Sequence, residues 1–197
     1  MMCGRYQFDA DAPAFGEIVR GLREAGGAFC SGEVFPTDRA PVLLAQDGAV
    51  RPAAFVWGFP NPHGKGAVIN ARAETAGMRP MFREALRIRR CAVPTSGFYE
   101  WSHDGSRRKY RFRAAHADSL YLAGLYQYFD GAGHFVVLTT AADASMQDVH
   151  DRMPVVLRQA EIRPWLLDND SVFPILEREH PALTREAQQE DAEICLW

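Results

Sequence analysis

The sequence predicts an α+β protein with a single domain and a largely antiparallel sheet. Three observations lead to this prediction. The chain of 197 residues has the length of one domain. Segments with the pattern of strands outnumber segments with helical periodicity. Most links between successive strand segments are short, and short links join antiparallel neighbours more readily than parallel ones.

Helices are predicted at three places. Apolar residues recur at helical spacing over 15–22, until Gly26-Gly27 ends the run. A proline fits the first turn of a helix over 80–88. The segment 159–167 also has a helical pattern, although Pro164 must shorten or kink it.

Strands are predicted where β-branched and aromatic residues gather between turn residues. These segments are 41–45, 49–57, the short piece 68–69, a piece beginning at Cys91, 109–113, 119–129, 134–140 and 154–157. Asp47-Gly48 is a hairpin signal between the first two segments. Residues 109–113 alternate basic and aromatic side chains, which is typical of a half-exposed strand.

Charge is distributed unevenly along the chain. The formal net charge is −3, yet residues 72–113 carry eleven Lys or Arg and four acidic residues, or +7. Residues 161–197 carry nine acidic residues and three arginines, or −6, and 168–197 is expected to be an acidic C-terminal extension, by default a solvated helix. The basic segment permits nucleic-acid binding, although a solvated face would explain it equally well.

Several classes of protein are disfavoured by composition. No run of about 18 apolar residues occurs, which disfavours a membrane span, and the start lacks the pattern of a signal peptide. The four cysteines are widely spaced without a CxxC pair, which argues against a zinc ribbon or a disulfide framework. We expect a cytoplasmic protein with reduced thiols and without a metal or cofactor.

Cys3 is the first candidate for chemistry. If Met1 and Met2 are removed, this residue carries an α-amine and a thiol on neighbouring atoms. Their ordinary pKa values are about 7.7–8.0 and about 8.5, so both have a usable unprotonated fraction near neutral pH. Such a pair traps an aldehyde as an imine that the sulfur closes to a thiazolidine. Taken alone, a cysteine near a terminus is more often only a small apolar side chain.

Three further polar motifs lie within apolar or turn-like stretches. Asn70 and Arg72 follow the β-branched pair Val68-Ile69, and Arg can make a forked contact to phosphate. Glu100 lies between aromatic residues, where desolvation would let it exchange a proton near pH 7. His150 is a natural proton carrier at neutral pH. Each motif alone is better explained structurally, as a turn, an exposed strand residue or a buried histidine.

Taken in order, these motifs resemble the SRAP family of abasic-site shielding proteins. The matching segments are 2–5, 69–75, 94–101 and 150–155, and the resemblance extends from Cys3 to about Leu167. It implies a barrel-like core flanked by helices. It also implies covalent attachment of the mature N-terminal cysteine to an abasic deoxyribose in single-stranded DNA, with autopeptidase and lyase-like chemistry.

The resemblance also implies roles for individual residues. Cys3 matches the nucleophile, Asn70 the asparagine beside the sugar, Glu100 the catalytic carboxylate and His150 the histidine that assists sugar opening. The residues expected to contact DNA are Arg5, Trp57, Arg72, Trp101 and Arg152. Phosphate contacts by arginine and stacking by aromatic rings bind unpaired DNA without reading its sequence.

One feature departs from the family pattern, in which cysteine follows the first methionine directly. Met2 intervenes here, so either translation starts at Met2 or the protein removes both methionines itself. Two alternatives stay open. An N-terminal-nucleophile amidohydrolase also begins with Cys-Gly, although no clear counterpart of its glycine-rich oxyanion segments is present. A non-covalent single-strand binding module would need the basic segment and the aromatic residues but not Cys3.

Overall fold

A closed five-stranded barrel organises the chain, and the computed structural model describes residues 4–188. The strands are β1 (Arg5–Phe8), β2 (Gly32–Val34), β3 (Arg39–Gln46), β4 (Ala49–Trp57), β5 (Phe59–Pro60), β6 (Ala67–Val68), β7 (Asn70–Arg72), β8 (Arg90–Thr95), β9 (Gly97–Trp101), β10 (Lys109–Ala114), β11 (Leu120–Phe129), β12 (Ala132–Ala141), β13 (Arg152–Pro154), β14 (Val156–Leu157) and β15 (Leu183–Ala187). The helices are α1 (Gly16–Glu24), α2 (Ala73–Ala76), α3 (Pro80–Ile88), α4 (Ile162–Leu167) and α5 (Val172–Glu177), with 3₁₀ turns at Pro13–Phe15 and Gln159–Glu161.

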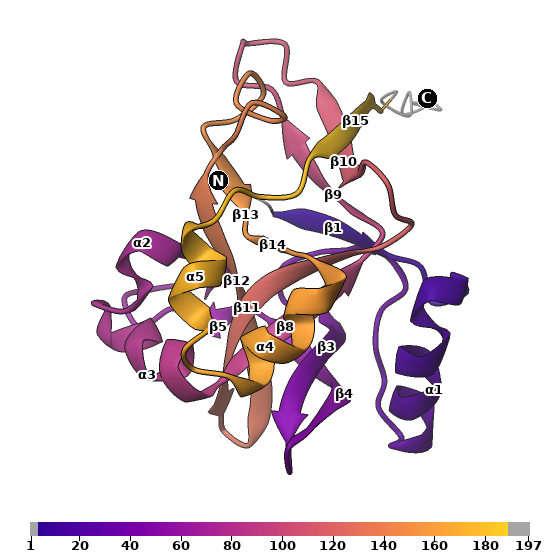
Figure 1. Ribbon diagram of the computed structural model, residues 1–197, viewed down its shortest axis with the longest axis vertical. Coiled ribbons are helices and arrows are strands. Elements are labelled where there is room, and N and C mark those ends of the chain that lie inside the picture. The colour runs from indigo at the N-terminus through magenta and orange to yellow at the C-terminus, as the bar shows by residue number, and fades with distance from the viewer. Residues whose placement is uncertain (1–3, 189–197) are drawn as a thin grey trace.

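The barrel is closed because β12 pairs with β4 on one side and with β11 on the other. Its strand order is β12-β4-β3-β8-β11, and β11 returns to pair with β12. Only the β12–β4 contact within this ring is parallel. The expected α+β class with a largely antiparallel, barrel-like core is confirmed. Figure 1 shows helices around the barrel, with α1 on one side and α2, α3 and α5 on the other.

A second sheet, the five-stranded sheet β15-β10-β9-β1-β2, covers one end of the barrel and is antiparallel throughout its described pairs (Figure 1). Its inner face, turned toward the core, includes Tyr6, Phe8, Phe98 and Phe112, all without exposed surface. Phe98 and Phe112 stack with ring centroids 5.3 Å apart. This sheet positions Arg5, Glu100 and Trp101 of the candidate site, which lie on its strands β1 and β9.

The predicted elements with strong local signals are confirmed. Asp47 and Gly48 both have positive φ, 50° and 71°, as a tight hairpin turn between β3 and β4 requires. The helix predicted over 80–88 is α3. Pro164 does shorten the last predicted helix, since residues 159–161 form a 3₁₀ turn and only 162–167 are α-helical. The strand expected over 154–157 divides into β13 and β14, which pair with different neighbours.

The segment after residue 168 differs from the solvated helix expected for it. Its described part forms the short helix α5 and the strand β15, which pairs with β10 along its whole length. Leu183 is buried, and the Arg185 guanidinium binds both carboxylate oxygens of Asp148. Residues 168–188 are therefore part of the folded unit. The pairing of β15 also covers β10, which would otherwise be an open sheet edge.

Candidate functional site

Glu100 lies at the end of β9 on the buried face of the five-stranded sheet. Only 2% of its surface is exposed. Its Oε1 accepts a hydrogen bond from the backbone N–H of Trp101 at 3.2 Å. β1 begins beside it, because Arg5 pairs with Tyr99, one residue before Glu100. A carboxylate at this depth is shielded from water and lies where the chain start enters the sheet.

His150 is equally enclosed, with 6% of its surface exposed. Its ring lies against that of His103, with ring centroids 4.2 Å apart. Burial and the charge of His103 lower the pKa of His150, and the nearby Asp151 carboxylate opposes them only in part. The imidazole is therefore neutral near pH 7 and able to accept a proton.

The contact between the two histidines links parts of the chain that are far apart in sequence. His103 begins the β9–β10 turn, three residues after Glu100, whereas His150 lies in the loop before β13. Hydrogen bonds from Ser106 to Asp104 hold the β9–β10 turn in shape. The fold thus brings the end of β9 and the His150 loop together, as a shared site for Glu100 and His150 requires.

Asn70, Arg72 and Arg152 gather along one strand of the barrel. Asn70 and Arg72 lie on β7, which runs parallel to β12 with Arg72 beside Thr139. β13 pairs with β12 so that Arg152 is opposite Ala141. Asn70 and Arg72 line an open pocket of about 390 Å³ that residues at the start of α3 also line.

The guanidinium of Arg152 is already engaged. It donates to both carboxylate oxygens of Glu74, at 2.6 and 2.8 Å, and to the carbonyl of Thr139 at 2.8 Å. This hydrogen bonding lowers the pKa of Glu74, so the pair stays ionised. The backbone N–H of Arg152 also donates to Nδ1 of His150 at 3.1 Å. Arg152 therefore positions the His150 loop, and its expected phosphate contact stays a prediction.

Arg5 and Trp101 lie together on the face of the five-stranded sheet opposite Glu100. The Arg5 guanidinium contacts two rings, 4.3 Å from the centroid of Phe35 and 5.1 Å from that of Trp101. Glu33 pairs with it at 3.1 Å. The cation and the rings form a partly exposed surface of the kind that unpaired bases and phosphates can contact.

Trp57 occupies a different place from the one expected. It has no exposed surface and packs between Tyr6 and Phe135, with centroid distances of 5.0 and 6.3 Å. Its indole N–H donates to the carbonyl of Ile69 at 3.1 Å. The structure gives Trp57 a core role in place of the expected DNA contact, because no face of its ring is left for a base.

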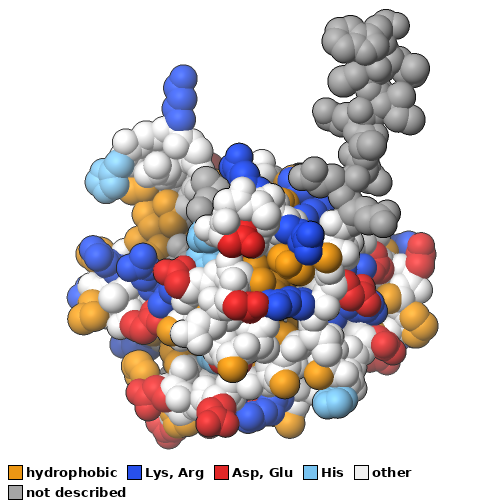
Figure 2. Space-filling view, turned by 90° about the horizontal axis from the view of Figure 1, so that it is seen from above, with side chains coloured by type: hydrophobic (Ala, Val, Ile, Leu, Met, Phe, Trp, Pro, Cys, Tyr) orange, Lys and Arg blue, Asp and Glu red, His pale blue; other side chains and the backbone are white. Residues whose placement is uncertain are grey.

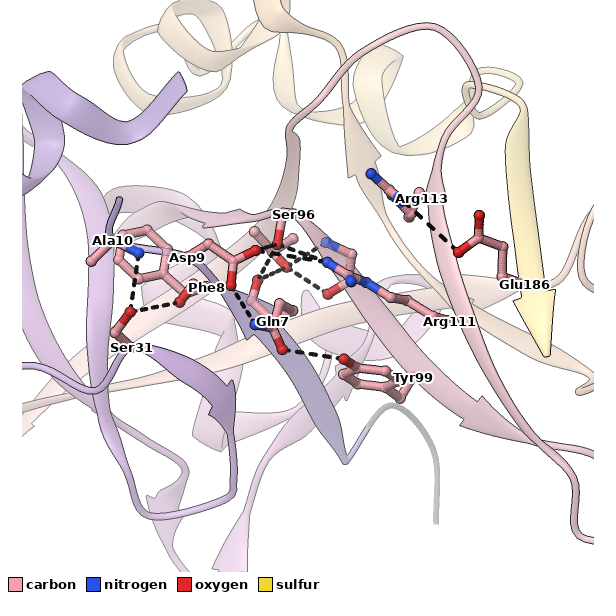
Figure 3. A network of polar contacts seen from close by, with 12 residues as sticks. Gln7, Phe8, Asp9, Ala10, Ser31, Ser96, Tyr99, Arg111, Arg113 and Glu186 are labelled. Carbon is pink, nitrogen blue, oxygen red and sulfur yellow. Dashed lines mark hydrogen bonds and ion pairs between the residues drawn. The ribbon is translucent and has the colours of Figure 1, made fainter. Parts of the chain in front are cut away.

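Cys3, the predicted nucleophile, lies outside the described residues. The residues that follow it are placed by a polar network that sequence reasoning missed (Figure 3). Gln7 on β1 accepts a hydrogen bond from the Tyr99 hydroxyl at 3.1 Å and donates to Asp9. Ser96 donates to Asp9 at 2.7 Å. These bonds hold β1 against β9, and single residues of these types carry no local signal for such a role.

The basic segment 72–113 does not form one continuous face. Its cations are spread over several elements, among them α3 and β10, which lie at different sides of the molecule in Figure 1. Figure 2, which looks onto the end that carries the β9–β10 turn, shows acidic and basic side chains interleaved.

Among residues 4–188 no group of three or more His, Cys, Asp or Glu side chains is arranged to hold a metal ion. No helix in the same range has the length and apolar character needed to span a membrane.

The fold and the order of the site residues define a class of protein. The family model described as SOS response associated peptidase (SRAP) matches residues 2–194. The chain belongs to the SRAP family.

The chain is also similar to individual curated proteins and solved structures. It is 32% identical to the abasic site processing protein YoqW of Bacillus subtilis, over 84% of this chain and 80% of that protein. It is 30% identical to the abasic site processing protein YedK of Escherichia coli, over 68% of this chain and 63% of that protein. A crystal structure of a Bacteroides thetaiotaomicron protein has the same fold, with a TM-score of 0.77 and 23% identity over 96% of this chain and 93% of that one.

Proposed function

We propose that this protein processes abasic sites in single-stranded DNA by attaching to them covalently through Cys3. The proposal rests on two observations: Glu100 is nearly fully buried beside the start of β1, and His103, three residues after Glu100, contacts the equally buried His150. The names of the relatives support the substrate, because several of them are abasic site processing proteins.

The chemistry begins with the closed form of the abasic sugar. The C1′ hydroxyl loses a proton while the ring oxygen gains one, which gives an aldehyde and a free C4′ hydroxyl. A neutral imidazole and a buried carboxylate suit these transfers, so we assign them to His150 and Glu100. Asn70 on β7 is assigned to hold the sugar by hydrogen bonds, since an amide both donates and accepts.

The covalent steps then follow from an amine and a thiol on one residue. The Cys3 amine adds to the aldehyde carbon, and loss of one water gives an imine. The thiolate adds to the imine carbon, the nitrogen takes up the proton, and a thiazolidine results. Ring closure removes the imine, which would otherwise promote β-elimination and strand cleavage.

Exposure of the Cys3 amine requires hydrolysis of the bond after Met2. We assign this step to the protein itself, with one water consumed and Glu100 assisting. A chain that keeps either methionine has an amide in place of the amine and forms no thiazolidine. The mass of the purified chain therefore has to be established before any assay.

Intact mass spectrometry tests the proposal directly. After mixing with a short single strand that carries one abasic site, the protein should gain the mass of one strand minus one water. A strand without the abasic site should add nothing after denaturation. Cys3→Ser should give no such stable adduct. A wild-type level of adduct from Cys3→Ser would reject the thiazolidine. If the wild-type chain forms no adduct, and Cys3→Ser binds the strand non-covalently as well as wild type does, the protein is better explained as a simple binding module.

A further inference from the structure

Two cations on the outer face of the five-stranded sheet share a single carboxylate. This face is the one opposite Phe98 and Glu100. Arg5 Nη1 on β1 lies 3.1 Å from Glu33 Oε2, and Lys109 Nζ on β10 lies 2.7 Å from Glu33 Oε1. All three side chains are partly exposed. Each oxygen of Glu33 thus faces a different cation.

Aromatic rings hold both cations in place. Arg5 lies over the rings of Phe35 and Trp101. The ammonium of Lys109 lies 4.2 Å from the ring centroid of Tyr99 and 5.9 Å from that of Trp101. Phe35 keeps 41% of its surface exposed at the edge of this group. Stacking of cations on rings limits their motion, so the positions of the two positive charges are preorganised.

A third cation on the same face is committed to the fold and provides a contrast. Arg111 pairs with Tyr99 across the strands, donates to Ser96 at 3.1 Å and lies 3.8 Å from Asp9 (Figure 3). Its partners belong to the network that holds β1 to β9. Glu33 is different, because the described contacts of its carboxylate are the two cations themselves.

Partly exposed ion pairs add little to stability, so stability alone gives no reason for one carboxylate between two cations. Two anionic oxygens facing an arginine and a lysine do have the arrangement of two oxygens of a DNA phosphate. We propose that Arg5 and Lys109 form a two-cation phosphate clamp, and that Glu33 is its internal competitor. A phosphate of the strand displaces the Glu33 carboxylate when DNA binds.

This proposal rests on the proposed function, since it names the residues that hold one phosphate of the same DNA strand. Its consequence concerns selectivity. Glu33 weakens the grip on every strand, damaged or intact, by the same factor. Intact DNA is then released quickly, whereas an abasic strand is retained by the covalent bond.

Glu33→Gln tests the competitor role, because it removes the charge and keeps the shape. Binding of an intact, fluorescently labelled single strand is measured by anisotropy over a range of salt concentrations. The variant should bind at least about threefold more tightly at low salt, with a salt slope steeper by up to about 0.7, the value for one phosphate of a single strand. Glu17→Gln is the matched control, since it removes the same charge from an exposed pair with Arg20 on α1.

Lys109→Met tests the clamp from the other side. It should weaken binding and flatten the salt slope, and the loss should be larger in the Glu33→Gln background, where no carboxylate competes. If Glu33→Gln binds like Glu17→Gln, Glu33 is not a competitor. If Glu33→Gln binds more weakly than wild type, Glu33 only positions the cations. Either result rejects the clamp with its competitor.

Adduct formation with an abasic strand, measured in the same samples, separates the two proposals. If the Cys3-dependent adduct forms normally and Glu33→Gln leaves the affinity for the intact strand unchanged, only the clamp is rejected. Tighter binding by Glu33→Gln without any adduct from verified Cys3-first protein rejects only the covalent function. Absence of binding by the wild-type chain at low salt rejects both.

Discussion

At the scale of single residues, His150 has one nitrogen with two alternative partners. Nδ1 lies 3.1 Å from the backbone N–H of Arg152, a hydrogen bond that only the unprotonated nitrogen accepts. It also lies 2.8 Å from Oδ1 of Asp151, a contact that is favourable when Nδ1 carries a proton. Gain of a proton therefore exchanges one partner for the other without moving the ring far. This arrangement suits a group that takes up a proton and gives it back.

The pH dependence of crosslinking should report the state of His150. Burial and then His103 lower its pKa below the ordinary value of about 6.5. The rate should fall as pH decreases through that lowered pKa, because protonated imidazole is no longer a base. His103→Ala removes a neighbouring charge and part of the burial, so the acidic limb should move to higher pH. His116→Ala, at an exposed loop position, is the control, and an unmoved limb in His103→Ala would contradict this assignment.

Glu100→Gln should slow crosslinking by about 10²–10⁴-fold, the usual contribution of a positioned acid or base. Binding of an intact strand should stay near the wild-type level, because Glu100 lies on the inner face of the sheet. Rates are compared at saturating DNA on chains whose mass shows Cys3 as the first residue. Glu186→Gln, an exposed acid on β15, controls for charge. A wild-type rate for verified Glu100→Gln would make Glu100 a structural residue.

At the scale of elements, β9 is the strand on which the site depends. It carries Glu100 on its inner face and Trp101 at its end, and it pairs with both β1 and β10. Its first residue, Gly97, has φ of 152°, and a Cβ added there would lie 2.6 Å from the carbonyl oxygen of Phe112. A side chain at this position therefore forces β10 away from β9.

Gly97→Ala should destabilise the fold by about 1–3 kcal/mol, the usual range for local backbone strain, with the steric overlap included. The measurement is the free energy of unfolding in urea. Gly131→Ala is the matched control, because Gly131 also has positive φ, 79°, but no atom lies within 4 Å of the added Cβ. Equal losses from the two substitutions would show that the contact with Phe112 costs nothing.

Elements with a signal inside their own sequence were the ones that could be predicted. α1 has helical periodicity, α3 has a proline in its first turn, and the Asp47-Gly48 turn needs two residues that tolerate positive φ. β1 and β2 are four and three residues long and exist because β9 and each other supply their partners. β15 buries only its first residue, so no alternation marks it as a strand.

The candidate site depends on sequence order in the same way. The motif residues Asn70, Glu100 and His150 could be named from that order, and their roles stay predictions; the fold places Glu100 beside the start of β1 and Asn70 on β7 next to β12. The residues that support them could not. Glu33 and Glu74 acquire their roles from cations 28 to 78 positions away, and no local pattern marks such pairs.

At the scale of the whole molecule, the net charge of −3 must be reconciled with a DNA partner. Two of the three arginines predicted to contact phosphate are paired with acids, Arg5 with Glu33 and Arg152 with Glu74. Among residues 4–188 no ion pair is formed by Arg72, which is exposed beside the pocket lined by Asn70. A chain with net negative charge attracts DNA only weakly as a whole. We therefore expect the strand to be held by individual cations at the site, such as Arg72, more than by the overall charge of the protein.

Arg72→Ala should therefore weaken binding of abasic and intact single strands by similar factors, because phosphate contacts do not read the lesion. The slope of log Kd against log salt should fall by about 0.7, the share of one phosphate on a single strand. Anisotropy titrations at several salt concentrations measure both quantities. Arg23→Ala, on the exposed face of α1, removes the same charge away from the site and should leave the slope almost unchanged. If the two variants share one slope with the wild type, the DNA strand does not pass over β7, and Asn70, also on β7, loses its assignment as the residue that holds the abasic sugar.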